Sequence, residues 1–449
     1  MSRFSEFLNK LSDHASKQCI DGDDGSHTYV QLIEAVAAWS THFDELDVAA
    51  GTVVGVRSDY SLQAIAAVLA LLVRKAVVAM IPRDRDVSTY LKDAHAAAVL
   101  EFSASGKYEW RRIPHATSHV LIEKLRSQGD GGIILFTSGS SGRPKAALQG
   151  LERFLYKLRN PGRPYRTLAF MLFDHIGGLD IAFHTLAAGG TLILTRRRDP
   201  EAVLELIERY RVEALPTSPS FLRLVCATPI NVQHDTSTLK VISYSSEPMD
   251  PSTLVRLSER FPNARITQKY GTTETGSPRS ISRPDDSLWL KFKEGVETKI
   301  IDGVLWIRTE CAILGYLNAT SPVDEDGWYC TGDQVDVDGE WIRVRGRVSD
   351  TINVGGEKAS PTEIEQVILE QDFVRAVIVF GEKHPLMGQV VAAEISVAPD
   401  FDTKDAAARV RRHCRQRLAP HKIPVRILFT DQDLTSARQK LQRRGVQGG

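Results

Sequence analysis

The chain has 449 residues, 42% of them hydrophobic and 25% charged, and its 56 acidic and 56 basic side chains balance. This length exceeds the usual size of one hydrophobic core, so we expect two or more domains; the balanced charge gives no support for nucleic-acid or anionic-membrane binding. The cysteines are scattered without paired spacing, which argues against a disulfide framework or a zinc site and favours a reducing, cytoplasmic setting.

Helical and strand-like patterns alternate through residues 1–130. Thr28 to Phe43 carries apolar residues at helical spacing, whereas Gly51 to Val56 and Ala76 to Ile81 are typical of strands. The most apolar segment, residues 64–73, is too short to span a bilayer and predicts a buried helix. We expect the amino-terminal residues to lead into a mixed-charge helix rather than to form a signal peptide. The alternation favours an α/β fold with a largely parallel sheet and no membrane association.

A loop rich in glycine and hydroxyl residues follows a predicted buried strand at residues 132–136. It reads Thr137-Ser138-Gly139-Ser140-Ser141-Gly142-Arg143-Pro144-Lys145. Glycine lets backbone N–H groups turn towards an anion, and the hydroxyls and the lysine add donors and a positive charge. The loop lacks the GxxxxGK[ST] spacing of a P-loop. It predicts phosphate binding, with a flexible surface turn as the alternative.

Two later segments carry side chains suited to a nucleotide. In Tyr270 to Glu274 a ring can stack on adenine, threonine hydroxyls can bond phosphate oxygens, and a carboxylate can bind Mg²⁺, which prefers oxygen donors. Asp333 follows a glycine and could accept hydrogen bonds from ribose hydroxyls. The alternatives are a strand-to-helix cap and a turn aspartate that bonds its own backbone.

These segments, in this order, resemble those of the adenylate-forming enzymes: acyl- and aryl-CoA synthetases, nonribosomal-peptide adenylation domains and luciferases. The pattern is most similar to that of the acyl- and aryl-acid CoA ligases. The further matching segments are Trp328 to Asp333, Gly346-Arg347 to Glu365, and the region of Lys440 and Arg443. The resemblance implies ATP-dependent activation of a carboxylic acid to acyl-AMP with release of pyrophosphate. It also implies Mg²⁺ and a thiol acceptor, which is CoA or the phosphopantetheine of an acyl carrier protein.

The resemblance implies an α/β fold with a large multi-subdomain amino-terminal domain over residues 1–346. Mainly parallel sheets and a small β subdomain would make up this domain, and the segments 303–308 and 314–317 resemble that subdomain. A small mobile α+β lid would follow over residues 350–449, with a hinge near Ser349.

The resemblance also assigns a role to each matching residue. The ATP and AMP site would contain Thr137, Ser138, Gly139, Ser140, Ser141, Gly142, Lys145, Ser246, Glu247, Tyr270, Gly271, Thr272, Thr273, Asp333 and Arg347, with Glu274 as the metal ligand. The groups at the reacting centre would be Lys440, His175 and Thr137. The acid pocket would contain Phe173, His175, Ile176, Gly177, Ser245 and Gly276, and the thiol tunnel Gly355, Gly356 and Lys358.

Several positions depart from the family pattern or leave a choice open. By itself, a lone histidine such as His175 is more often a packed structural residue. Within the family pattern, His175 matches the histidine of the acid pocket better than Asp174 matches the aspartate that holds an α-amine. This predicts an acid without a free α-amine. Serines 245 and 246 stand where relatives carry glycine, Ser349 replaces the usual hinge residue, and Gln439 replaces a glycine. An amidase-signature hydrolase and a non-catalytic nucleotide-binding module stay open as alternatives.

Overall fold

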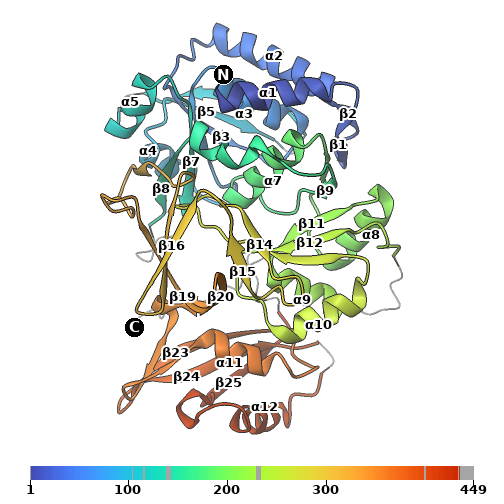
Figure 1. The fold of residues 1–449 in the computed structure, drawn as a ribbon, viewed down its shortest axis with the longest axis vertical. Helices are drawn as coiled ribbons and strands as arrows, with labels where there is room; N and C mark the ends of the chain where they lie inside the picture. Colours follow the sequence, from blue (N-terminus) through green and yellow to red (C-terminus); the bar gives the residue numbers. More distant parts are fainter. Residues whose placement is uncertain are drawn as a thin grey trace.

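The strands predicted between residues 51 and 137 form the first sheet, in the upper part of Figure 1. The computed structural model describes residues 2–103, 105–114, 117–137, 143–228, 234–398, 401–432 and 434. Within these residues the sheet has the order β18-β8-β7-β4-β3-β5-β6, with β7, β4, β3 and β5 parallel. Its strands are β3 (Val53–Arg57), β4 (Val77–Met80), β5 (Ala98–Phe102), β6 (Tyr108–Arg112), β7 (Gly132–Thr137), β8 (Lys145–Gly150) and β18 (Gly315–Tyr316).

One segment joins a different sheet from the one expected. The resemblance assigned residues 314–317 to the small β subdomain, but β18 pairs antiparallel with β8, so that Gly315 lies opposite Leu148. That assignment was wrong, because a two-residue strand carries too little pattern of its own to fix its partner. The pairing brings Tyr316 next to the start of β8 at Lys145.

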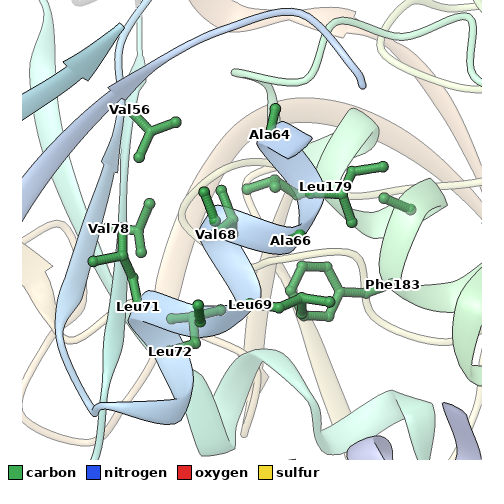
Figure 2. Packing of buried hydrophobic residues seen from close by; sticks show 14 of the residues in the cluster. Val56, Ala64, Ala66, Val68, Leu69, Leu71, Leu72, Val78, Leu179 and Phe183 are labelled. Carbon is green, nitrogen blue, oxygen red and sulfur yellow. The ribbon is translucent and has the colours of Figure 1, made fainter. Parts of the chain in front are cut away.

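Helix α3 (Leu62–Val73) fills the space between the first sheet and α7 (Ile176–Ala187), as Figure 2 shows. Every residue from 64 to 72 is buried, which explains why this segment is apolar on all sides. In Figure 2 its side chains lie between Val56 and Val78 of the sheet and Leu179 and Phe183 of α7. The prediction of a buried helix is confirmed. Among the residues described here, no helix combines the length and the apolar character that crossing a bilayer would require.

Local capping signals fix where several helices begin. Thr28 and Gln31 form a capping box at the start of α2 (Tyr29–Glu45), and the Ser61 side chain accepts a hydrogen bond from the Ala64 N–H at the start of α3. The remaining helices of the first half are α1 (Arg3–Asp13), α4 (Val87–Asp93), α5 (Val120–Ser127), α6 (Leu151–Phe154) and the short 3₁₀ helix η1 (Tyr156–Arg159).

The second sheet has the order β13-β12-β11-β9-β10-β1-β2 in the described chain, and all its pairs except β1–β2 are parallel. Because β12 and β13 are parallel, the segments that follow them, which begin at Ser245 and Lys269, leave the sheet at the same edge. The strands are β1 (Gln18–Gly22), β2 (His27–Thr28), β9 (Arg166–Leu168), β10 (Thr191–Leu194), β11 (Ala214–Thr217), β12 (Val241–Tyr244) and β13 (Arg265–Gln268). The helices packed with them are α7, α8 (Pro200–Tyr210), α9 (Pro219–Ala227) and α10 (Pro251–Arg260).

An antiparallel sheet lies at the centre of Figure 1. Its order in the described chain is β14-β15-β20-β19-β17-β16, and Asp333 of β19 lies opposite Arg347 of β20. This is the small β subdomain that the resemblance implied. Its strands are β14 (Ser280–Ser282), β15 (Leu290–Phe292), β16 (Val296–Ile301), β17 (Val304–Thr309), β19 (Tyr329–Asp338) and β20 (Trp341–Arg347).

The carboxy-terminal part has its own sheet and core, at the lower end of Figure 1. Strands β21 (Ile352–Val354), β22 (Glu357–Ala359), β23 (Ala376–His384), β24 (Gly388–Ser396) and β25 (Arg426–Thr430) pack with α11 (Pro361–Ile368) and α12 (Ala406–Arg415). The α/β fold with a small α+β carboxy-terminal domain is confirmed. The boundary near Ser349, which lies in the short 3₁₀ helix η2 (Val348–Asp350), and the mobility of the domain stay predictions.

Candidate active site

A cleft of about 610 Å³ lies where the first two sheets, the antiparallel sheet and α11 meet. This volume is in the range usual for small-ligand pockets. Thirteen of the residues predicted for the site line it: Thr137, Lys145, His175, Ile176, Ser246, Glu247, Tyr270, Gly271, Thr272, Thr273, Glu274, Asp333 and Arg347. The cleft therefore brings together segments that lie as much as 210 positions apart in the chain, from Thr137 to Arg347.

Asp333, Tyr270 and Arg347 form a hydrogen-bonded group on one wall. The Tyr270 hydroxyl donates to Asp333 Oδ2 at 2.5 Å, and Arg347 Nε donates to Asp333 Oδ1 at 3.1 Å. Burial raises the pKa of Asp333 although Arg347 opposes this shift, and burial together with the Asp333 charge raises the pKa of Tyr270 well above its ordinary value. The hydroxyl thus stays a donor, while the carboxylate keeps lone pairs for a further partner.

Glu274 is held by a residue that the sequence did not single out for the site. The Tyr316 hydroxyl donates to Glu274 Oε1 at 2.5 Å, across 42 positions of the chain. The Lys145 ammonium lies 5.2 Å from the centre of the Tyr316 ring, which is within cation–π range. Burial, followed by the Glu274 charge, raises the pKa of Tyr316. Tyr316 therefore links the carboxylate predicted to bind metal with the lysine predicted to bind phosphate.

The residues present fit a magnesium ion. Mg²⁺ is usually held by one or two carboxylates together with substrate phosphates and water. Glu274 supplies one largely buried carboxylate beside Lys145 and Thr137, and no group of three or more metal-ligating side chains occurs in the described residues. Such a donor set suits an ion that arrives with a nucleotide.

His175 lies at the start of α7, and Ile176 follows it into the same cleft. Its Nδ1 accepts a hydrogen bond from the Gly177 N–H at 3.2 Å, so a neutral ring carries its proton on Nε2. Asp174, the alternative recognition residue, is not among the residues that line the cleft. His175 thus caps the start of α7 and also lines the cleft.

The wall after β12 contains a buried charge network that no local sequence pattern predicts. Glu247 accepts hydrogen bonds from the Ser220 N–H and hydroxyl, and Arg223 Nη1 lies 3.3 Å from Asp250 Oδ2. Burial acts against the Asp250 charge, but Arg223 and the hydroxyls of the first turn of α10 outweigh it and hold its pKa below the ordinary value. Ser246 in this wall has a φ of 79°, a left-handed conformation that usually favours glycine.

Other predicted residues lie away from the cleft lining or outside the described chain. Phe173 is 2% exposed and packs on Tyr60 in the main core, where its ring serves the fold. Gly177, Ser245, Gly276, Gly355, Gly356 and Lys358 are also not among the lining residues. The residues 138–142 and Lys440 lie outside the described residues.

Gly355 and Gly356, assigned to a thiol tunnel, form the turn between β21 and β22. Their φ angles are 60° and 93°, which explains the glycines. A Cβ on Gly355 would meet the Met387 side chain of the β23–β24 hairpin at 2.5 Å. The turn is thus packed against the neighbouring hairpin, and Lys358 follows it on β22.

Comparison with known proteins gives two family matches. The model described as AMP-binding enzyme matches residues 7–317, and that described as AMP-binding enzyme C-terminal domain matches residues 363–440.

Curated relatives include several CoA ligases. The chain is 30% identical over 344 residues to an indoleacetate–CoA ligase of Aromatoleum aromaticum, over 70% of this chain and 66% of the relative. It is 27% identical to a 2-succinylbenzoate–CoA ligase of Geobacillus kaustophilus, over 93% of this chain and 92% of the relative. It is 25% identical to 4-coumarate–CoA ligase-like 9 of Arabidopsis thaliana, over 71% of this chain and 62% of the relative. The matches to the Aromatoleum and Arabidopsis proteins thus span less than two thirds of those relatives' own lengths.

Among solved structures, the fold is similar to that of the anthranilate CoA ligase AuaEII in complex with anthranoyl-AMP. The TM-score is 0.85 at 20% identity, over 98% of this chain and 95% of that one. At this identity the likeness concerns the fold.

Proposed function

Because this chain belongs to the family of AMP-binding enzymes, we propose that it activates an organic carboxylic acid with ATP and then transfers the acyl group to a thiol. The observation that carries this proposal is the convergence of Lys145, Glu274, Asp333 and His175 on one cleft. In the first step a carboxylate oxygen of the acid attacks the α-phosphorus of ATP. The bond between that phosphorus and the bridging oxygen to the β-phosphate breaks, so that acyl-AMP and pyrophosphate form.

The nucleotide would lie against the antiparallel sheet. Tyr270 is mostly buried and fixed by its bond to Asp333, so its ring could support adenine, while the remaining lone pairs of Asp333 accept the ribose hydroxyls. Arg347 would contact the ribose and phosphate, because its side chain is 54% exposed towards the cleft. Gly271 lines the cleft with Ser246 and Glu247, and a Cβ on it would meet the Gly276 carbonyl oxygen at 2.4 Å, so this glycine permits the close turn of the loop.

The phosphates would lie between Thr137, Lys145 and the threonines 272 and 273. When bound at Glu274, Mg²⁺ would neutralise phosphate charge. The residues 138–142 would add donors to the β- and γ-phosphates, and Lys440 would meet the carboxylate and the bridging oxygen. Such transfers depend on positioning and charge stabilisation by groups of this kind.

The acid would lie beside His175 and Ile176. The absence of Asp174 from the cleft lining supports an acid without a required α-amino group, since an ammonium group needs an acidic partner there. Ser245 directly precedes the lining residue Ser246, and Gly276 lies two positions after Glu274; both would shape the end of this pocket.

The second step would form a thioester on CoA or on a carrier phosphopantetheine. Rotation of the carboxy-terminal domain about Ser349 would bring the turn at Gly355 and Gly356, with Lys358, to the cleft. CoA ligases among the relatives support CoA as the first acceptor to test.

Acid-dependent ATP–pyrophosphate exchange tests the first step. The assay would use indoleacetate, 2-succinylbenzoate, anthranilate and 4-coumarate beside the twenty amino acids. We expect exchange with at least one acid that lacks an α-amine, and thioester formation after CoA is added. Exchange with amino acids alone would contradict the proposed acid class.

Two controls separate the alternatives. A non-catalytic module would bind ATP or AMP in calorimetry and give no exchange with any acid. An amidase-signature hydrolase would cleave amides without ATP; membership of the AMP-binding family argues against it.

A further inference from the structure

Near the His175 end of the cleft lies a group of charged side chains that the proposed function does not use. Of these, Lys269 lines the cleft, whereas Lys157, Asp180, His184 and Arg279 are not among its lining residues. Ile176, Asp180 and His184 follow one another at four-residue intervals on α7, so they lie along one side of this helix. Lys157 of η1 forms an ion pair with Asp180 and also donates to the Ser277 carbonyl at 3.1 Å. The Lys157 side chain is 7% exposed, so this pair is held inside the protein.

Lys269 adds a second positive charge to this group. It precedes Tyr270 directly and lines the same cleft as His175 and Ile176. Its backbone N–H donates to the Tyr244 carbonyl, but within the described chain its ammonium group makes no hydrogen bond or ion pair.

The charges of this group do not cancel. Lys157 forms the direct ion pair with Asp180, so Asp180 acts on Lys269 only as a shared counter-charge without contact. Burial lowers the pKa of His184, which favours its neutral form, and Arg279 is a further positive charge that acts on both His184 and Lys269. This group of side chains around Lys269 therefore has a net positive charge beside the predicted acid pocket.

Ligand binding would make an unpaired charge on Lys269 unfavourable. Its side chain reaches the solvent of the cleft, yet enough protein surrounds it that burial lowers its pKa, against the attraction of Asp180. Desolvating an ammonium group is costly unless an anion pairs with it. A bound ligand that expelled water from the cleft would raise this cost, unless the ligand itself supplied the anion.

Resting on the proposed function, we propose that the acid activated here is a dicarboxylic acid whose second carboxylate pairs with Lys269. The first carboxylate lies beside His175 and reacts with ATP. A substrate amine would meet the positive charge of Lys269, and the nearby aspartate, Asp180, is already paired with Lys157. A purely apolar acid would leave Lys269 desolvated and unpaired.

Matched pairs of acids test this inference in the exchange assay: succinate with butanoate, glutarate with pentanoate, and phthalate with benzoate. A charge-assisted hydrogen bond corresponds to roughly ten- to hundredfold in kcat/KM. We expect the wild-type enzyme to prefer at least one diacid over its monoacid by such a factor. Lys269→Met should remove most of that preference, and the KM for ATP should move much less than the KM for the diacid. Lys124→Met on α5, an exposed lysine outside the cleft, is the matched control and should keep the preference.

The possible failures point to different errors. If wild type uses monoacids as well as diacids, the inference is overturned while the proposed function stands. If Lys269→Met raises the KM for ATP equally with every acid, the lysine serves the nucleotide and the inference is likewise overturned. If neither this panel nor the acids named above support exchange, the proposed function fails and the inference fails with it.

Discussion

Replacing Asp333 by alanine should weaken nucleotide binding and, separately, destabilise the wall that carries Tyr270. If the carboxylate accepts ribose hydroxyls, each charge-assisted bond is worth about 1.5–3 kcal/mol. The KM for ATP should therefore rise roughly tenfold or more, because about 1.4 kcal/mol corresponds to one decade. The KM for the acid should change much less, because the predicted acid pocket lies around His175.

The expected loss of stability comes from the two groups that lose Asp333 as a hydrogen-bond partner. The Arg347 side chain is 54% exposed, so its charge can be hydrated again at a cost of no more than about 1 kcal/mol. The Tyr270 hydroxyl is buried, and without its acceptor it should cost about 1–3 kcal/mol. In a Tyr270→Phe background, Asp333→Ala should therefore destabilise the protein less than it does alone.

Thermal unfolding of the wild type, both single variants and the double variant would measure this coupling, and steady-state kinetics on the same four proteins would measure the KM values. Equal rises in the KM for ATP and for the acid would mean that Asp333 supports the whole cleft. An unchanged KM for ATP in a folded Asp333→Ala protein would refute the ribose contact. Equal destabilisation in both backgrounds would refute the role of the Tyr270 hydroxyl.

Three further predictions concern charge and catalysis. Asp250→Ala should reduce the free energy of unfolding by about 3 kcal/mol or more and so lower the melting temperature, because it leaves the buried Arg223 without its main partner and removes a helix cap. A melting temperature equal to that of wild type would contradict this. Because burial raises the pKa of Asp333, its contribution to stability should fall as pH rises from the ordinary aspartate pKa through the raised value, while AMP affinity should increase over the same window. Calorimetry across this pH range would measure the affinity for AMP, and Asp333→Asn should abolish the pH dependence of that affinity. Lys440→Ala should abolish adenylate formation with AMP binding retained; exchange at the wild-type rate would remove the lysine from the mechanism.

Local sequence patterns determined the elements of this protein and the order of its motifs. The buried helix α3, the capping box of α2 and the strand before Thr137 were all readable, because helix periodicity, capping and strand runs depend on residues a few positions apart. The family pattern added the general position of His175, Glu274 and Asp333, because those motifs are short and their order is specific.

Only the tertiary structure decided which partners these residues have. Tyr316 meets Glu274 across 42 positions because β18 joins the first sheet, and no local pattern encodes that register. The same holds for Lys269, whose charge is significant only because Lys157 already forms the direct ion pair with Asp180. The sequence shows which side chains are charged, but whether a charge is paired depends on contacts that form only when distant segments pack together.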